Sequence, residues 1–178
     1  IKLYGDWHKA IELVDNLGPS IKKGYDIAVN KFSKDLLKIV LFSIATGTPP
    51  KGTGINWEPH SPITTKKYGE HPIYYLTGTY YRAIGLFKYK DKTLVGLPRS
   101  KGRSSSGGIT LGELAKILEY GTGGNGGGKS NGTIPPRPLW NPSIKAVGGK
   151  EKLRSMIIKN IRKQLYGFGI RANQVKWR

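Results

Sequence analysis

The stretch SIKKGYDIAVNKFSKDLLKIVLFSIA, residues 20–45, decides the fold of this chain because it predicts one long amphipathic helix. Its apolar residues recur every three or four positions, as they do on one face of an α-helix. They are Ile21, Tyr25, Ala28, Val29, Phe32, Leu36, Leu37, Val40, Leu41 and Ile44. Ser20 stands where an N-cap belongs, and Gly18-Pro19 is expected to end a shorter helix, Trp7–Leu17. The remaining elements must pack around this helix of about seven turns.

The sequence that follows predicts a long loop and then a hairpin. Gly47–Pro72 has no sustained period and is rich in proline, which is typical of an irregular segment. Residues 74–97 are rich in Tyr, Ile and Phe. They predict a strand or short helix, then two strands that turn at Lys90-Asp91-Lys92.

Two more helices are expected in the last part of the chain. Thr110 and Glu113 fit a capping box at the start of a helix that runs to about Tyr120. Lys150–Leu165 returns to helical spacing. The expected fold class is therefore α+β, with further helices and long loops. We divide the chain into an α+β domain, 1–145, and a basic C-terminal helix and tail, 146–178.

The charge is strongly positive. The 178 residues include 30 Lys and Arg against 11 Asp and Glu, a formal net charge of +19. From Lys145 to Arg178 there are ten basic residues and one acid, Glu151. Such a charge repels copies of the chain and attracts polyanions or acidic protein surfaces.

Composition also limits the catalytic chemistry available to the chain and the cellular location expected for it. The chain has no cysteine, so disulfides and thiolate catalysis are excluded. Its most apolar stretch, Leu36–Ala45, is too short to span a bilayer, and no signal-peptide pattern opens the sequence. We expect a soluble protein, made in a cytoplasm, with no membrane partner.

No pattern of catalytic or ligand-binding residues stands out. Residues 123–130 match the phosphate-loop pattern G-x-x-x-x-G-K-S/T, with Lys129 and Ser130 in the last two positions. A phosphate loop needs a strand before it and a helix after it, whereas here a helix precedes and a proline-containing segment follows. The three histidines, His8, His60 and His71, lack metal-site spacing. We therefore expect no cofactor, no metal and no enzymatic activity.

The middle of the chain carries a set of short motifs in a fixed order. They are Trp57-Glu58-Pro59-His60-Ser61-Pro62-Ile63-Thr64, Leu76-Thr77-Gly78-Thr79-Tyr80, Leu94-Val95-Gly96, AKILEYGT at 115–122 and IPPRPLWNPSI at 134–144. This order resembles the phage virion-morphogenesis and tail-completion family, over about residues 55–145. Tyr80 stands where Leu is usual in that family, and Leu139 and Trp140 stand where Phe and Leu are commoner. For the fold, the resemblance implies that the sheet is small, mostly antiparallel and packed against the long helix.

The resemblance implies a structural protein of a tailed-phage virion. Such a protein, synthesised in the bacterial host cytoplasm, would form a ring at the head–tail junction with copies of itself, sixfold preferred and twelvefold possible. Its partners would be neighbouring neck, connector and tail proteins, with DNA passing through the lumen. The residues expected at the interface are Trp57, Tyr120, Gly121, Thr122, Pro135, Pro136, Arg137, Pro138 and Trp140. A simpler alternative is that the proline-rich segment Ile134–Pro142 closes the domain's own core.

The strong positive charge by itself suggests a second possible function, nucleic-acid binding. A nucleic-acid-binding protein would use the basic C-terminal segment to neutralise phosphates. Residues expected to contact a polyanion are Lys101, Arg103, Lys152, Arg154, Lys159, Arg162 and Lys163. An acidic neighbouring protein is the alternative partner for the same charges. A small enzyme is a third and much weaker hypothesis.

Overall fold

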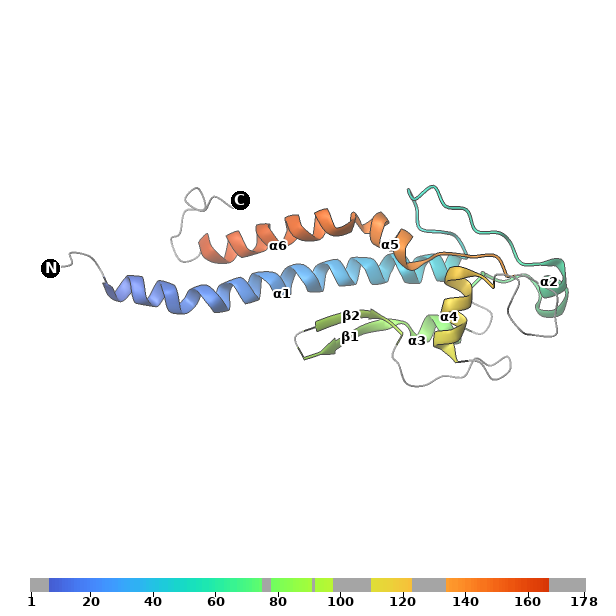
Figure 1. The fold of residues 1–178 in the computed structure, drawn as a ribbon, viewed down its shortest axis with the longest axis horizontal. Coiled ribbons are helices and arrows are strands. Elements are labelled where there is room, and N and C mark those ends of the chain that lie inside the picture. Colours follow the sequence, from blue (N-terminus) through green and yellow to red (C-terminus); the bar gives the residue numbers. More distant parts are fainter. Residues whose placement is uncertain (1–6, 75–77, 91, 98–109, 123–133, 167–178) are drawn as a thin grey trace. The chain divides into compact units, whose positions relative to one another are not determined.

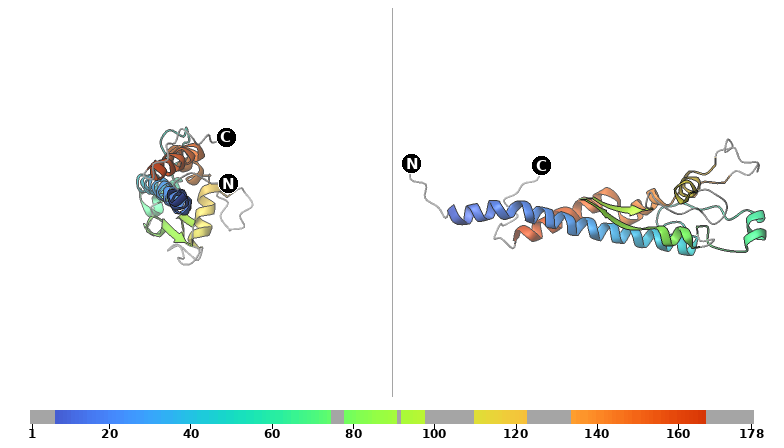
Figure 2. Two further views of the ribbon diagram at one scale, coloured as in Figure 1. Left: turned by 90° about the vertical axis from the view of Figure 1, so that its left-hand side faces the viewer. Right: turned by 90° about the horizontal axis from the view of Figure 1, so that it is seen from below.

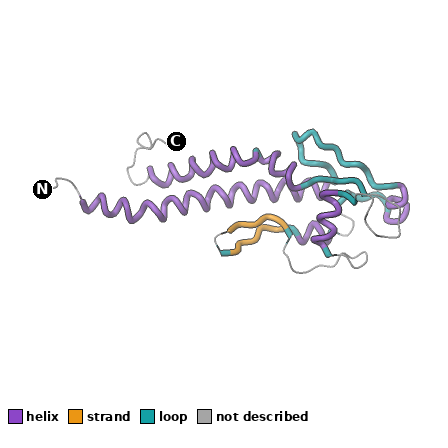
Figure 3. The backbone as a smooth tube through the Cα atoms, viewed as in Figure 1, coloured by secondary structure: helices purple, strands orange, loops and turns teal. Residues whose placement is uncertain are grey.

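The computed structural model describes residues 7–74, 78–90, 92–97, 110–122 and 134–166, and it shows an α+β fold (Figure 1). The expected fold class is confirmed: a two-stranded antiparallel sheet lies among helices, the longest of which is α1 (Figure 3). In chain order the elements are α1 Trp7–Thr46, α2 Pro62–Tyr68, α3 Thr79–Ala83, β1 Gly85–Tyr89, β2 Lys92–Gly96, α4 Leu111–Tyr120, α5 Trp140–Val147 and α6 Gly149–Tyr166.

The first helix is longer than the sequence predicted. α1 runs for 40 residues and contains Pro19, so the expected break at Gly18-Pro19 is wrong, and Ser20 is a buried residue inside the helix and not an N-cap. A proline disfavours helix partly through the Cβ of the residue before it, and Gly18 has none. Pro19 still lacks the amide hydrogen that would bond the preceding turn, and α1 continues through it.

The described fold contains two compact units, which share α1. One, the helix-pair unit, consists of α1 up to Phe32 and α6 from Lys150. The other, the hairpin unit, extends from Ser33 to Gly149.

The helix-pair unit is held by a line of small side chains. Ser20, Gly24 and Ala28 are buried at intervals of four residues on α1. A Cβ atom on Gly24 would lie 2.7 Å from backbone atoms of Ile161. α6 runs alongside α1 in both views (Figures 1 and 2). The two backbones therefore approach closely, and Ile21 and Tyr25, expected in the core, are left more than a third exposed.

The hairpin unit takes the second half of the predicted apolar stripe into its core. Leu36, Val40 and Ile44 are buried one turn apart on α1, as expected from their spacing. The other buried apolar side chains of this unit are Trp57, Tyr74, Tyr80, Ile84, Leu111, Leu139 and Val147.

The hairpin itself follows the prediction. β1 and β2 pair antiparallel, with Leu86 opposite Val95 and Phe87 opposite Leu94. Lys90, at the turn, has φ 52°, in the left-handed region that a tight hairpin requires.

Two short helices were missed in the sequence. α2 lies within the segment expected to be a loop; Ser61 caps it by accepting from the Thr64 amide, and Pro62 occupies its first turn. α5 begins at Trp140, inside the proline-rich segment Ile134–Pro142, where no helix was expected. Proline is tolerated in the first turn of a helix, so Pro142 does not prevent it.

Candidate functional site

The proline-rich segment 134–139 docks onto the hairpin unit. The Arg137 amide donates to the Leu118 carbonyl at 2.7 Å, and the Arg137 guanidinium donates to the carbonyls of Glu58 and Pro59 at 2.9 and 3.0 Å. The Trp57 indole donates to the Pro138 carbonyl at 3.0 Å. The side-chain contacts of Arg137 and Trp57 join stretches about 80 residues apart in sequence, and the Arg137 amide joins the segment to α4, 19 residues before it. The segment therefore closes the core of its own unit, as the simpler alternative predicted.

A buried carboxylate fixes the point where α5 begins. Glu119, on α4, accepts from the Leu139 amide at 2.8 Å and from the Trp140 amide at 3.3 Å. A negative charge next to free amides at a helix N-terminus is stabilising. Glu119 therefore performs the capping that no side chain at Leu139 can supply, a role that the sequence did not reveal.

The residues expected at an interface divide into internal and outward-facing ones. Trp57 and Arg137 are 5% and 4% exposed, so their contacts are internal. Gly121 has φ 72°, and a Cβ there would lie 2.6 Å from the Ile134 carbonyl oxygen, so this position requires glycine for the fold. Tyr120 is 75% exposed and remains free for a partner. The other members, Thr122, Pro135, Pro136, Pro138 and Trp140, are half-buried or exposed.

Aromatic rings fill the space beneath the docked segment. The ring of Tyr74 lies 5.1 Å from that of Trp57 and 5.4 Å from that of Tyr80. The Tyr74 hydroxyl donates to the Arg137 carbonyl. Burial is the main cause that raises the pKa of both tyrosines well above the ordinary value. Both hydroxyls therefore stay protonated and serve packing and hydrogen bonding.

Two histidine rings lie in tilted contact with each other. The rings of His60 and His71 are 4.3 Å apart, and neither Nε2 atom has a hydrogen-bond partner among the described residues. Burial lowers the pKa of His60, and the nearby His71 and Arg137 lower it further. The described residues contain no group of three or more His, Cys, Asp or Glu that could hold a metal ion.

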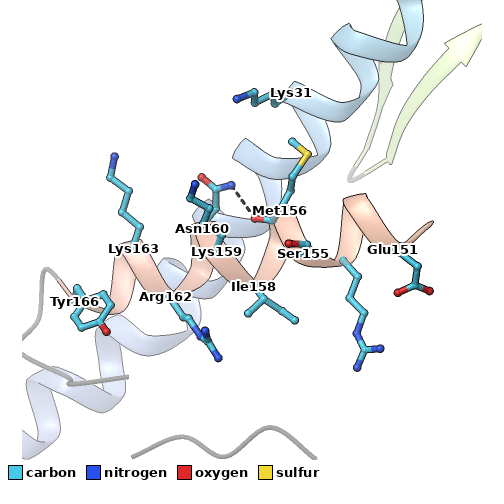
Figure 4. Close-up of a pocket in the computed structure, with 11 residues that line it drawn as sticks. Lys31, Glu151, Ser155, Met156, Ile158, Lys159, Asn160, Arg162, Lys163 and Tyr166 are labelled. Atoms are coloured by element: carbon cyan, nitrogen blue, oxygen red, sulfur yellow. Dashed lines mark hydrogen bonds between the residues drawn. The ribbon is translucent and has the colours of Figure 1, made fainter. Parts of the chain in front are cut away.

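A group of basic side chains lies on α6 and the adjoining part of α1 (Figure 4). We call it the α6 basic face: Lys31 from α1, and Arg154, Lys159, Arg162 and Lys163 from α6. These cations border a shallow groove of about 960 Å³, whose lining includes one acid, Glu151. Polar groups lie among them, with Ser155, Asn160 and Tyr166 also lining the groove.

Four of the seven residues expected to contact a polyanion meet on this face. They are Arg154, Lys159, Arg162 and Lys163. Lys152 is exposed on the same helix and does not line the groove, while Lys101 and Arg103 lie outside the described residues. Sequence reasoning missed Lys31, which helix pairing brings beside α6 from more than 120 positions away in the chain.

The glycine-rich match at 123–130 falls outside the described residues. On either side of it, α4 ends at Tyr120 and residues 134–139 form neither helix nor strand, so the flanking structure is not the strand and helix of a phosphate loop. None of the helices in the described ranges combines the length and the apolar composition needed to cross a bilayer.

Comparison of the chain with protein-family models, with curated proteins and with solved structures finds no match.

Proposed function

We propose that this chain is a structural subunit of a tailed-phage virion, which assembles into a ring with copies of itself at the head–tail junction. The ordered motifs between residues 55 and 145 support the proposal through their resemblance to tail-completion proteins. Neighbouring neck and tail proteins would be its other partners, and sixfold symmetry is the first expectation.

The observation that carries the assembly proposal is an exposed apolar stripe on α1. Ile11, Val14, Ile21 and Tyr25 are 58%, 67%, 36% and 45% exposed. Their spacings of three, seven and four residues place them along one face of the helix. Contiguous exposed apolar surface of this kind marks a protein–protein contact.

The hairpin offers a second surface of different shape. Phe87 and Leu94 face each other across the two strands, and Tyr89 shares their side of the hairpin. All three are at least 36% exposed. Within the described residues the sheet has two strands, a size that is marginally stable without further packing. Two unlike surfaces on one subunit favour head-to-tail contacts, which close a ring when the rotation between subunits closes.

The test is the mass of the purified protein by light scattering, with negative-stain imaging for rings. Ile21→Glu places a charge in the α1 stripe and is expected to shift the protein to monomer. Ile27→Glu is the matched control, because Ile27 is 40% exposed on another face of the same helix. The proposal fails if the unmodified chain stays monomeric alone and with phage neck proteins, or if both variants assemble normally.

A further inference from the structure

We propose that the α6 basic face binds the phosphate backbone of double-stranded nucleic acid without reading its sequence. The inference rests on the charges of this face and does not depend on ring formation.

The composition of the face favours nucleic acid over an acidic protein. Five of the eleven residues that line the groove are Lys or Arg. Protein–protein interfaces are depleted in lysine at their centre, whereas nucleic-acid interfaces are strongly positive and polar. Serine, asparagine and tyrosine side chains, all present in the groove, commonly donate to phosphate oxygens.

The cations are available for an external partner. Arg154, Lys159, Arg162 and Lys163 are exposed, as is Lys31. Among the described residues, no carboxylate forms an ion pair with any of these five. An unpaired cation can neutralise a phosphate without first giving up a protein partner.

The spacing of the cations suits a duplex. Arg154 and Arg162 are separated by two turns of α6, which is about 12 Å along its axis. This equals the width of the major groove of B-DNA, about 12 Å. Cations at the two ends of the face can therefore reach the phosphates that border one groove, while Lys31 adds a contact from α1.

The experiment measures binding of a fluorescent 20-base-pair DNA duplex to the full chain at several salt concentrations. With five phosphate contacts, log K should fall with log salt at a slope of about −4.5. The triple variant Lys159→Gln, Arg162→Gln, Lys163→Gln should bring the slope to about −2. It should also weaken binding about 100-fold near 0.15 M salt.

The matched control removes the same net charge elsewhere. Lys38→Gln, Lys66→Gln and Lys116→Gln change three exposed lysines of the hairpin unit and should weaken binding less than about threefold. Circular dichroism checks that both triple variants keep the helical content of the unmodified chain.

Three outcomes would overturn the inference. Equal weakening by the two triple variants would mean that diffuse charge, and not this face, attracts the duplex. Tighter binding to a polyglutamate peptide of equal charge would identify an acidic protein partner. Tighter binding to single-stranded DNA, lost in Tyr166→Ala, would identify stacking on unpaired bases. Ring assembly is measured without DNA, so the two proposals can fail separately.

Discussion

His60 and His71 place two titratable rings at the edge of a core that already holds a guanidinium. Their rings are 4.3 Å apart, and after burial the two groups that lower the pKa of His60 are His71 and Arg137. A second proton in this cluster would add like charge to a partly buried site.

Acid should therefore destabilise the hairpin unit. The pKa of His60 is lowered from 6.5 in the folded chain, so the unfolded chain binds the proton more readily. The stabilisation is complete above pH 6.5 and is lost as the pH falls through 6.5 towards the folded pKa. Urea unfolding followed by tryptophan fluorescence at pH 7.5 and pH 5.5 measures this change. In His60→Gln, most of the difference in unfolding free energy between the two pH values should disappear. A variant that keeps the whole difference would contradict the role given to His60.

For single residues, hydrogen bonds between sequence neighbours could be predicted, whereas hydrogen bonds between residues far apart in the sequence could not. The capping box is present: the Thr110 hydroxyl accepts from the Glu113 amide at 3.2 Å, and the Glu113 carboxylate accepts from the Thr110 amide at 2.8 Å. Gly121 caps the end of α4, and its amide donates to the Ile117 carbonyl at 2.8 Å. Glu119 was unpredictable because the amides it binds are 20 residues away and meet it only after the chain has folded.

Among the elements, the pairing of α1 with α6 gives the sharpest test. Gly24→Ala would place a Cβ 2.7 Å from the backbone of Ile161, which cannot rotate away as a side chain can. Overpacking of this kind costs about 1–3 kcal/mol, more than the 0.5–1 kcal/mol that alanine contributes in a helix. A net loss of about 1–2 kcal/mol in the free energy of unfolding is therefore expected by urea denaturation.

The control for that prediction is Gly112→Ala in α4. A Cβ at Gly112 would meet nothing closer than the Thr110 hydroxyl at 4.0 Å. This change should leave stability unchanged or raise it by about 0.5 kcal/mol. If Gly24→Ala also leaves stability unchanged, the result contradicts the close approach of the α1 and α6 backbones at this position.

Helix periodicity located α1, α4 and α6, but not the continuity of α1 or the presence of α2 and α5. Pro19 was expected to end the first helix, as proline commonly does, but α1 continues through Gly18-Pro19. α2 had a usable signal in Ser61-Pro62, an N-cap residue followed by proline in the first turn. α5 lacks such a signal at its start, because its cap comes from Glu119 on another helix.

For the whole molecule, net charge opposes assembly and favours polyanion binding. Copies carrying +19 repel one another over a distance that falls from about 30 Å at 0.01 M salt to about 8 Å at 0.15 M. Raising salt over this range should therefore increase the ring fraction measured by light scattering. The same change should weaken duplex binding. Self-association that weakens with added salt would show that ion pairs, and not apolar contacts, join the subunits.

The fold class followed from the sequence, but the arrangement within it did not. The β-like composition around the Lys90-Asp91-Lys92 turn predicted the hairpin, and the long apolar stripe predicted the helix. The docking of 134–139 onto residues 57–59 depends on hydrogen bonds to backbone carbonyls, which carry no side-chain signature. Lys31 joins the basic face for a similar reason, since only helix pairing places it there.

The two hydrogen bonds between Thr122 and Ile134 clamp the ends of the intervening eleven-residue stretch, at 2.9 Å and 2.8 Å. These bonds join the end of α4 directly to the start of the segment 134–139, so the described residues on the two sides stay together independently of the covalent path between them. An epitope or fluorescent label spliced into residues 123–133 would therefore mark each subunit while leaving α4, α5 and the segment between them in place.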